Sequence, residues 1–191
     1  MKKSLLISLC FGITISTQAQ YTLSINPAEG YTPQIGVLIS MLDELKGRVT
    51  SQVQQMNQEE TDYLMDDKAN RFGALILHLA ATERYYQQNT FHDIKLNEED
   101  ESEWSIAFEL GDKAREVLKD KPISYYLEKW DEVRNETKRV LKTKDDQWLL
   151  QTKNFSPEYQ YNHYWAWYHV MEHQANHMGQ IALMKKRLNE E

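Results

Sequence analysis

The chain has 191 residues, with 22 Lys and Arg against 29 Asp and Glu, and so a formal net charge of −7. This length fits one domain, and the acidic balance argues against nucleic acid as the main partner, because phosphate binding needs concentrated basic residues. A mean hydropathy of −0.70 argues against an integral membrane protein, while 41% hydrophobic residues suffice for a packed core.

The first 19 residues have the pattern of a secretory signal peptide. Two lysines precede an apolar run over residues 5–15, and small residues follow at Thr17 and Ala19. The apolar run is too short to span a membrane, which takes about 20 residues. We therefore expect cleavage near Ala19 and export of residues 20–191 to the periplasm or the extracellular space.

The only cysteine of the chain, Cys10, lies inside this apolar run. It would be removed with the signal peptide. The mature chain would then have no disulfide and no cysteine nucleophile, so its stability would come from its core.

The rest of the chain is predicted to be helical. Thr32 and Pro33 suit the N-cap and the first turn of a helix, and Asp66 or Asp67 could cap a second one. Apolar residues recur at helical spacing in five segments, which cover residues 33–56, 67–88, 97–121, 124–142 and 161–188.

Breaks between these segments are short and polar. Gly111 interrupts the third segment, residues 144–147 are predicted to form a turn, and residues 147–155 are the only weak candidate for a strand. We therefore expect an all-α fold, a four-helix bundle with one additional shorter helix.

Histidines provide the clearest chemical signal. His169, His173 and His177 stand at i, i+4 and i+8 in the last helix and share nearly one face. Neighbours about 6 Å apart along the axis can share a cation, whereas the outer two, about 12 Å apart, cannot. The binding pair is therefore either His173 and His177 or His169 and His173. A third ligand must come from another helix, and His78 is the candidate.

The alternative interpretation is structural. His78 lies in an apolar stretch, where a histidine on its own is more often a hydrogen-bonded core residue. The last-helix histidines could form a polar stripe, and spacing supports a metal site and such a stripe equally. Three histidines on one ion would leave positions open for water or substrate.

Two segments resemble the DinB/YfiT-like superfamily of helical proteins. Residues 173–181, His-Gln-Ala-Asn-His-Met-Gly-Gln-Ile, are similar to its last-helix pattern His-x-x-x-His-x-Gly-Gln. Residues 77–85 resemble its second helix, which supplies the first histidine. In this pattern Gly179 is expected to allow close helix packing, and Gln180 to orient a ligand or pack between helices.

The resemblance implies a four-helix bundle over residues 20–191 with a divalent metal on His78, His173 and His177. It leaves His169 as an extra histidine that lines the pocket or hydrogen-bonds a ligand. Imidazole suits several metals, and we expect zinc or nickel, with iron or manganese as alternatives.

Members of the superfamily with known activity include thiol-dependent S-transferases and isomerases, and some resemble hydrolases. We therefore expect an exported metal-dependent hydrolase or group-transferase acting on a small molecule, with a non-catalytic metal-binding or stress-associated bundle as the alternative. Reduced thiols are scarce outside the cytoplasm, which argues against thiol transfer. A homodimer through the bundle faces stays open.

No general base is assigned. Glu83 lies about 140° from His78 around its helix, and both Glu83 and Glu172 are expected to be solvated or salt-bridged at the surface. His92 and His163, near helix ends, are expected on the surface or in loops. The aromatic residues of 161–168 could form the wall of a pocket, but we expect them to pack in the core.

Overall fold

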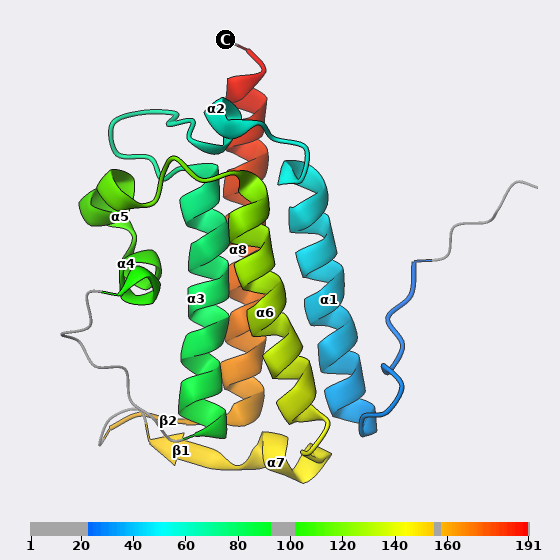
Figure 1. The fold of residues 1–191 in the computed structure, drawn as a ribbon. Helices are drawn as coiled ribbons and strands as arrows, with labels where there is room; N and C mark the ends of the chain where they lie inside the picture. The colour runs from blue at the N-terminus through cyan, green and yellow to red at the C-terminus, as the bar shows by residue number, and fades with distance from the viewer. Residues whose placement is uncertain (1–22, 93–101, 155–157, 191) are drawn as a thin grey trace, which may run out of the picture.

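Four long helices lie side by side along one axis (Figure 1). The computed structural model describes residues 23–92, 102–154 and 158–190. In it the long helices are α1 (Pro33–Val53), α3 (Phe72–Phe91), α6 (Ile123–Leu141) and α8 (His163–Leu188). Helices α1 and α8 run in one direction, and α3 and α6 run in the other. The predicted all-α four-helix bundle is confirmed.

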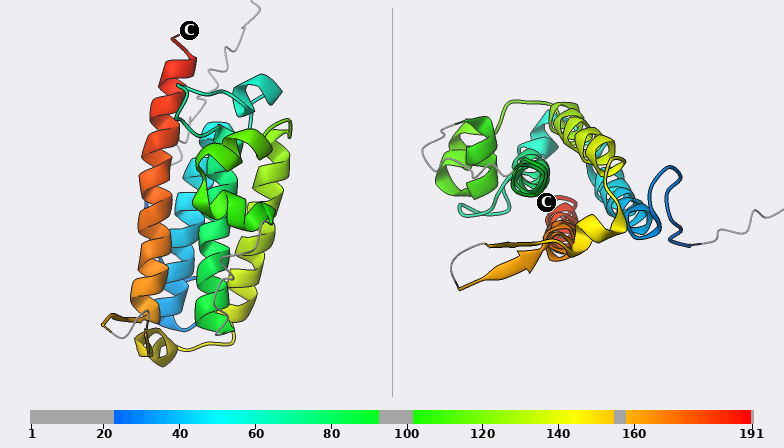
Figure 2. Two further views of the ribbon diagram at one scale, coloured as in Figure 1. Left: turned by 90° about the vertical axis from the view of Figure 1, so that its left-hand side faces the viewer. Right: turned by 90° about the horizontal axis from the view of Figure 1, so that it is seen from below.

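Shorter elements surround this bundle. They are α2 (Gln58–Thr61), α4 (Glu103–Glu109), α5 (Gly111–Val117), α7 (Asp146–Leu150), β1 (Thr152–Asn154) and β2 (Gln160–Asn162). Figure 2 shows that α4 and α5 lie outside the four-helix ring and that the antiparallel β1–β2 hairpin lies at the end where α8 begins. The predicted strand within residues 147–155 is confirmed only for β1, because α7 occupies the first part of that segment.

The third predicted helix is divided. Its start at residues 97–101 lies outside the described residues, and so do residues 1–19, for which a signal peptide stays a prediction. Helices α4 and α5 are separate because the backbone takes positive φ angles at Leu110 (59°) and Gly111 (75°). Glycine adopts such angles without steric cost, so the chain changes direction here.

One predicted helix start is corrected, and hydrogen bonds show why. Helix α3 begins at Phe72, five residues later than expected, and Asp66 accepts hydrogen bonds from the backbone of Lys68 and Ala69 (both 2.8 Å). Asp66 therefore stabilises a turn and does not cap the helix.

The start of α1 is capped by another helix. Pro33 occupies the first turn as predicted, but the Thr32 side chain makes no capping bond. Instead Asp146 of α7 accepts hydrogen bonds from the backbone N–H groups of Gln34 (3.1 Å) and Ile35 (3.2 Å). This contact joins segments more than 100 residues apart, which helix-start patterns do not reveal.

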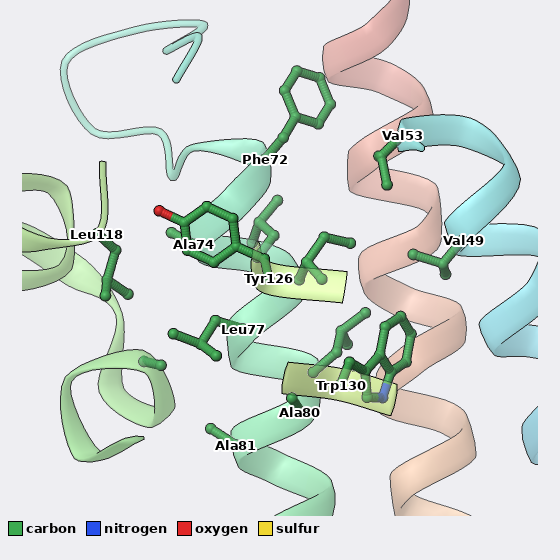
Figure 3. Close-up of a cluster of buried hydrophobic side chains, with 14 of the residues drawn as sticks. Val49, Val53, Phe72, Ala74, Leu77, Ala80, Ala81, Leu118, Tyr126 and Trp130 are labelled. Carbon is green, nitrogen blue, oxygen red and sulfur yellow. The ribbon is translucent and has the colours of Figure 1, made fainter. Parts of the chain in front are cut away.

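Buried apolar side chains form two clusters, one towards each end of the bundle. The first contains Phe72, Leu77 and Trp130 with their neighbours (Figure 3), and the second contains Leu42 and Trp167. Within the described ranges, none of the helices combines the length and apolar character that crossing a membrane requires.

Gly73 provides a test of the first cluster. A Cβ atom at this position would lie 2.7 Å from Cδ2 of the fully buried Tyr126 ring, which has no space to move. We expect Gly73→Ala to lower the free energy of unfolding by about 1–3 kcal/mol, measured by urea denaturation.

The matched control is Gly47→Ala in the exposed middle of α1, where an added Cβ meets nothing within 4 Å. Alanine there should raise the stability by about 0.5–1 kcal/mol, because it favours helix more than glycine does. Equal effects of the two substitutions would contradict the tight packing between α3 and α6.

Candidate metal site

The three predicted histidines converge between α3 and α8. The ligand nitrogens of His78, His173 and His177 all lie within 4.8 Å of one another. The Nε2 atoms of His78 and His173 are 2.7 Å apart, and the ring centroids of the three residues are 4.6–4.8 Å apart. Of the two pairs that spacing left open, the structure places His173 and His177 against His78.

Hydrogen bonds orient two of these rings. His78 Nδ1–H donates to the backbone oxygen of Ala107 (2.8 Å), and His177 Nδ1–H donates to Gln180 Oε1 (3.0 Å). Both rings therefore keep an unprotonated Nε2, which is the state that binds a metal. Gln180 was expected either to orient a ligand or to pack between helices, and its contact with His177 agrees with the first of these roles. Gly179 does not serve close packing, because an added Cβ would meet nothing within 4 Å.

Burial keeps the site uncharged. Desolvation, and the repulsion of an imidazolium by the neighbouring rings, lower the pKa of His78 to about 4 and that of His173 to about 3. Burial also lowers the pKa of His177. At neutral pH all three imidazoles are neutral, and a neutral ring offers its lone pair to a cation without first losing a proton.

The residues fit a divalent ion. Nitrogen ligands about 2.0–2.1 Å from a tetrahedral zinc ion lie about 3.3 Å from one another, so small side-chain rotations would bring the three nitrogens to one ion. Aromatic rings extend from the site along α8. The His169 ring lies 5.9 Å from the His173 ring and stacks on the Trp165 ring at 5.3 Å. His169 is thus a neighbour of the site on its aromatic side.

Glu83 differs from its prediction as a surface residue. It is fully buried and forms an ion pair with Arg134, whose Nε and Nη2 donate to its two oxygens (2.8 and 2.9 Å). Thr137, Trp130 and Gln174 donate further hydrogen bonds to the same carboxylate. This carboxylate is fully engaged and cannot serve as a general base.

The ion pair keeps Glu83 charged. Burial by itself raises the pKa of this carboxyl, but the charge of Arg134 and the hydrogen bonds of Arg134 and Thr137 outweigh it and hold the pKa below its ordinary value. Arg134 also donates to Asp43 of α1 (3.1 Å). The rotation of about 140° predicted between His78 and Glu83 agrees with this arrangement, because Glu83 contacts Arg134 of α6 and Gln174 of α8, whereas His78 contacts His173 and His177.

Other predictions had mixed outcomes. Glu172 is exposed and accepts a hydrogen bond from His169 Nδ1 (3.3 Å), as expected for a solvated residue. His92 is exposed at the end of α3. The surface prediction for His163 was wrong, because this ring is buried, packs on Trp148 at 4.1 Å and hydrogen-bonds the Trp148 backbone oxygen (2.9 Å).

The aromatic segment 161–168 divides between two roles. Trp167 is fully buried in the core, as expected for the whole segment, whereas Trp165 and Tyr168 are about half exposed. Tyr161 and Trp165 line a cavity, and Tyr161 also packs against the second apolar cluster. Core packing was therefore wrong for Trp165 but not for Tyr161, and the alternative of a pocket wall holds for both.

Sequence patterns missed the partners of the site. Ala107 of α4 contributes only a backbone oxygen, which no side-chain pattern can reveal. Gln174 and Arg134 had a detectable signal. Each stands at helical spacing from core residues, and so does Glu83. Glu83 and Arg134 on core-facing positions of two helices would have indicated a buried pair of opposite charges.

These features define a class of protein: a helical bundle with a three-histidine site that can hold a divalent metal. The family model of the mycothiol S-transferases matches residues 37–189. The chain therefore belongs to this family of DinB/YfiT-like proteins. A comparison with curated proteins gives no significant match.

The Glu83 ion pair predicts a pH-dependent stability. Glu83→Gln should lower the free energy of unfolding by about 3–5 kcal/mol at neutral pH, because it leaves the Arg134 charge buried and incompletely paired. Since the pKa of Glu83 is lower in the folded state, its contribution is complete above the unfolded-state pKa and declines as the pH falls below about 4.3. The difference between wild type and variant should therefore narrow in acid.

Glu136→Gln is the matched control, because Glu136 pairs with Arg139 at the exposed surface of α6. This change should barely move the urea midpoint, since exposed pairs are screened by water. A wild-type advantage over Glu83→Gln that stayed constant down to pH 2 would show that Glu83 titrates no differently in the folded and unfolded states.

Proposed function

We propose that this protein is a metal-dependent transferase in which His78, His173 and His177 hold one divalent ion. The observation that carries the proposal is the convergence of three neutral imidazole rings, two of them fixed by Nδ1 hydrogen bonds. Membership of a family named for S-transfer to a thiol supports the reaction class. We further propose zinc or nickel as the ion, on the basis of the all-nitrogen ligand set.

The chemistry follows from charge. When bound, a divalent ion on neutral ligands keeps its charge and lowers the pKa of a thiol or water at its open positions. Transfer would form a carbon–sulfur bond and break the bond between that carbon and its leaving group, which departs with the thiol proton. Ala107 and Gln180 would hold the ligand rings, and α4 would shield His78 from water.

Hydrolysis of a small molecule is the second candidate. The signal-peptide pattern in the first 19 residues favours it, because an exported protein meets few reduced thiols. Export is itself part of this proposal. In hydrolysis water replaces the thiol, and the same three histidines carry the reaction.

Metal content tests the site. We expect about one zinc or nickel ion per chain in wild-type protein purified without a histidine tag, measured by plasma mass spectrometry, and loss of that ion in His78→Ala and His173→Ala. His92→Ala, at the exposed residue that directly follows α3, should retain it. Metal kept in His78→Ala but lost in His169→Ala would move the site along α8.

Turnover separates the two reactions. The metal-loaded protein would be assayed with mycothiol or N-acetylcysteine and monochlorobimane for transfer, and with 4-nitrophenyl acetate without thiol for hydrolysis. The transfer proposal expects thiol consumption that chelation abolishes and zinc or nickel restores. Hydrolysis without transfer would support the second candidate, and neither activity would leave the non-catalytic metal-binding alternative.

Gln180 predicts a graded effect on the metal. Gln180→Leu removes the acceptor that orients His177, so metal affinity should fall about 10–100-fold, measured by competition with a chromogenic chelator. Asn176→Leu, an equally sized change at an exposed position of α8, should leave the affinity within about twofold. Equal affinities for both variants would show that His177 needs no orienting partner.

A further inference from the structure

A cavity of about 720 Å³ lies beside the three histidines, where α3 and α8 meet the β1–β2 hairpin. This volume is within the range of roughly 300–1,000 Å³ of small-molecule sites. Most of its described lining residues are aromatic, and they are Tyr85, Tyr86, Tyr159, Gln160, Tyr161, Asn162 and Trp165. The predicted histidine pattern assigns no role to this cavity.

Ring contacts connect the cavity wall to the metal site along two routes. Tyr86 and Trp165 both contact the His169 ring (5.8 and 5.3 Å), which lies 5.9 Å from the His173 ring. On the other side, Tyr85 packs against Phe108 (5.1 Å), which contacts the His78 ring (6.5 Å). A molecule in the cavity would therefore be separated from the histidines by a single ring.

The wall carries no charge. Its described lining residues are four tyrosines, a tryptophan and two amides, with no acidic or basic side chain among them, and burial raises the pKa of Tyr85 and Tyr86. A charged ligand would lose its hydration here without gaining an opposite charge, which is costly. The cavity therefore favours an uncharged occupant.

One polar atom of each of the two amides of the wall is already engaged. Gln160 Nε2 donates to Asn154 Oδ1 (2.8 Å), and Asn162 Oδ1 accepts from the Trp165 backbone (2.8 Å) as the N-cap of α8. A sugar, which needs many hydrogen bonds, would have to make them with the tyrosine hydroxyls and the remaining polar atom of each amide. Flat tyrosine and tryptophan faces instead offer stacking to an aromatic ring.

One buried hydroxyl lies on α3 between a residue of the cavity wall, Tyr86, and a residue of the site, His78. Thr82 stands one turn from both His78 and Tyr86 on the same face of α3. It is 5% exposed, and its Oγ1 has no hydrogen-bond partner in the described part of the chain. A ligand with a single polar group directed towards the histidines would satisfy this hydroxyl, and buried polar groups are rarely left without a partner.

We propose that this cavity binds the acceptor substrate of the transfer reaction and selects an uncharged molecule with a flat aromatic ring. The inference rests on the proposed function, since an acceptor bound here would lie one ring away from the proposed metal ligands. Trp165 and Tyr161 determine the specificity by stacking on the ring, and Thr82 receives the polar group at the end nearest the histidines.

Binding of 2-naphthol, an uncharged aromatic probe with one hydroxyl, tests this inference by calorimetry on the full chain at neutral pH. We expect wild type to bind 2-naphthol at least about tenfold more tightly than 2-naphthoate, its charged analogue, and to show no binding of the disaccharide cellobiose. Trp165→Ala and Tyr161→Ala should each lower the affinity for 2-naphthol by about fivefold or more, which corresponds to about 1 kcal/mol of stacking energy.

Tyr168→Ala is the matched control, because Tyr168 is as exposed as Trp165 on the same helix but does not line the cavity. It should leave 2-naphthol binding within about twofold. Equal binding of 2-naphthol and 2-naphthoate, preference for cellobiose, absence of 2-naphthol binding, or wild-type affinity in both cavity variants would each overturn the inference.

The same probe separates this inference from the proposed function. 2-Naphthol binding requires no metal, so His78→Ala should retain it while losing the ion. Metal binding without 2-naphthol binding would contradict the proposal that the cavity binds an aromatic acceptor, and it would still support the metal site. Binding of 2-naphthol to a protein that holds no metal would support the aromatic cavity and contradict the proposed metal site.

Discussion

The buried ion pair of Glu83 and Arg134 determines how the four helices fit together. Its hydrogen bonds reach α6 through Arg134, α8 through Gln174 and α1 through Asp43. Along each long helix, this polar layer lies between residues of the first apolar cluster and residues of the second. Two apolar clusters alone would tolerate sliding of one helix along another, whereas a carboxylate with five donors is satisfied in only one arrangement.

This constraint reaches the metal site through α8. Gln174, which hydrogen-bonds Glu83, directly follows His173 in the chain and precedes His177 by less than one turn. The contact therefore fixes the rotation of α8 at the height where its histidines must face His78. On the other side, α4 packs against α3 and supplies the Ala107 oxygen that orients His78. The ligands are thus held by the bundle on one side and by a short helix on the other.

The sequence was sufficient for the features that repeat along one helix. Apolar spacing predicted the four long helices, and the His-x-x-x-His spacing with its family resemblance predicted which three histidines meet. Contacts between distant segments could not be predicted this way. Asp146 caps α1 from a different helix, and the cavity joins the end of α3 to a hairpin, so each depends on the tertiary fold. Glu83 was predicted at the surface because a charged residue is rarely buried unless it is paired, and its partner Arg134 lies 51 residues away in the chain.

Glu83 of α3 is charged, whereas His78 of the same helix is neutral, and the chemistry of the site depends on both. Towards α6, Arg134 keeps Glu83 ionised, while towards α8, burial keeps His78 and His173 neutral. A free carboxylate beside these rings would favour their protonation and would cancel part of the charge of a bound ion. Because both oxygens of Glu83 are taken by Arg134 and its other donors, the described part of the site offers only neutral ligands. An ion bound there keeps its full charge for the substrate, and the uncharged aromatic wall next to it leaves that charge unscreened.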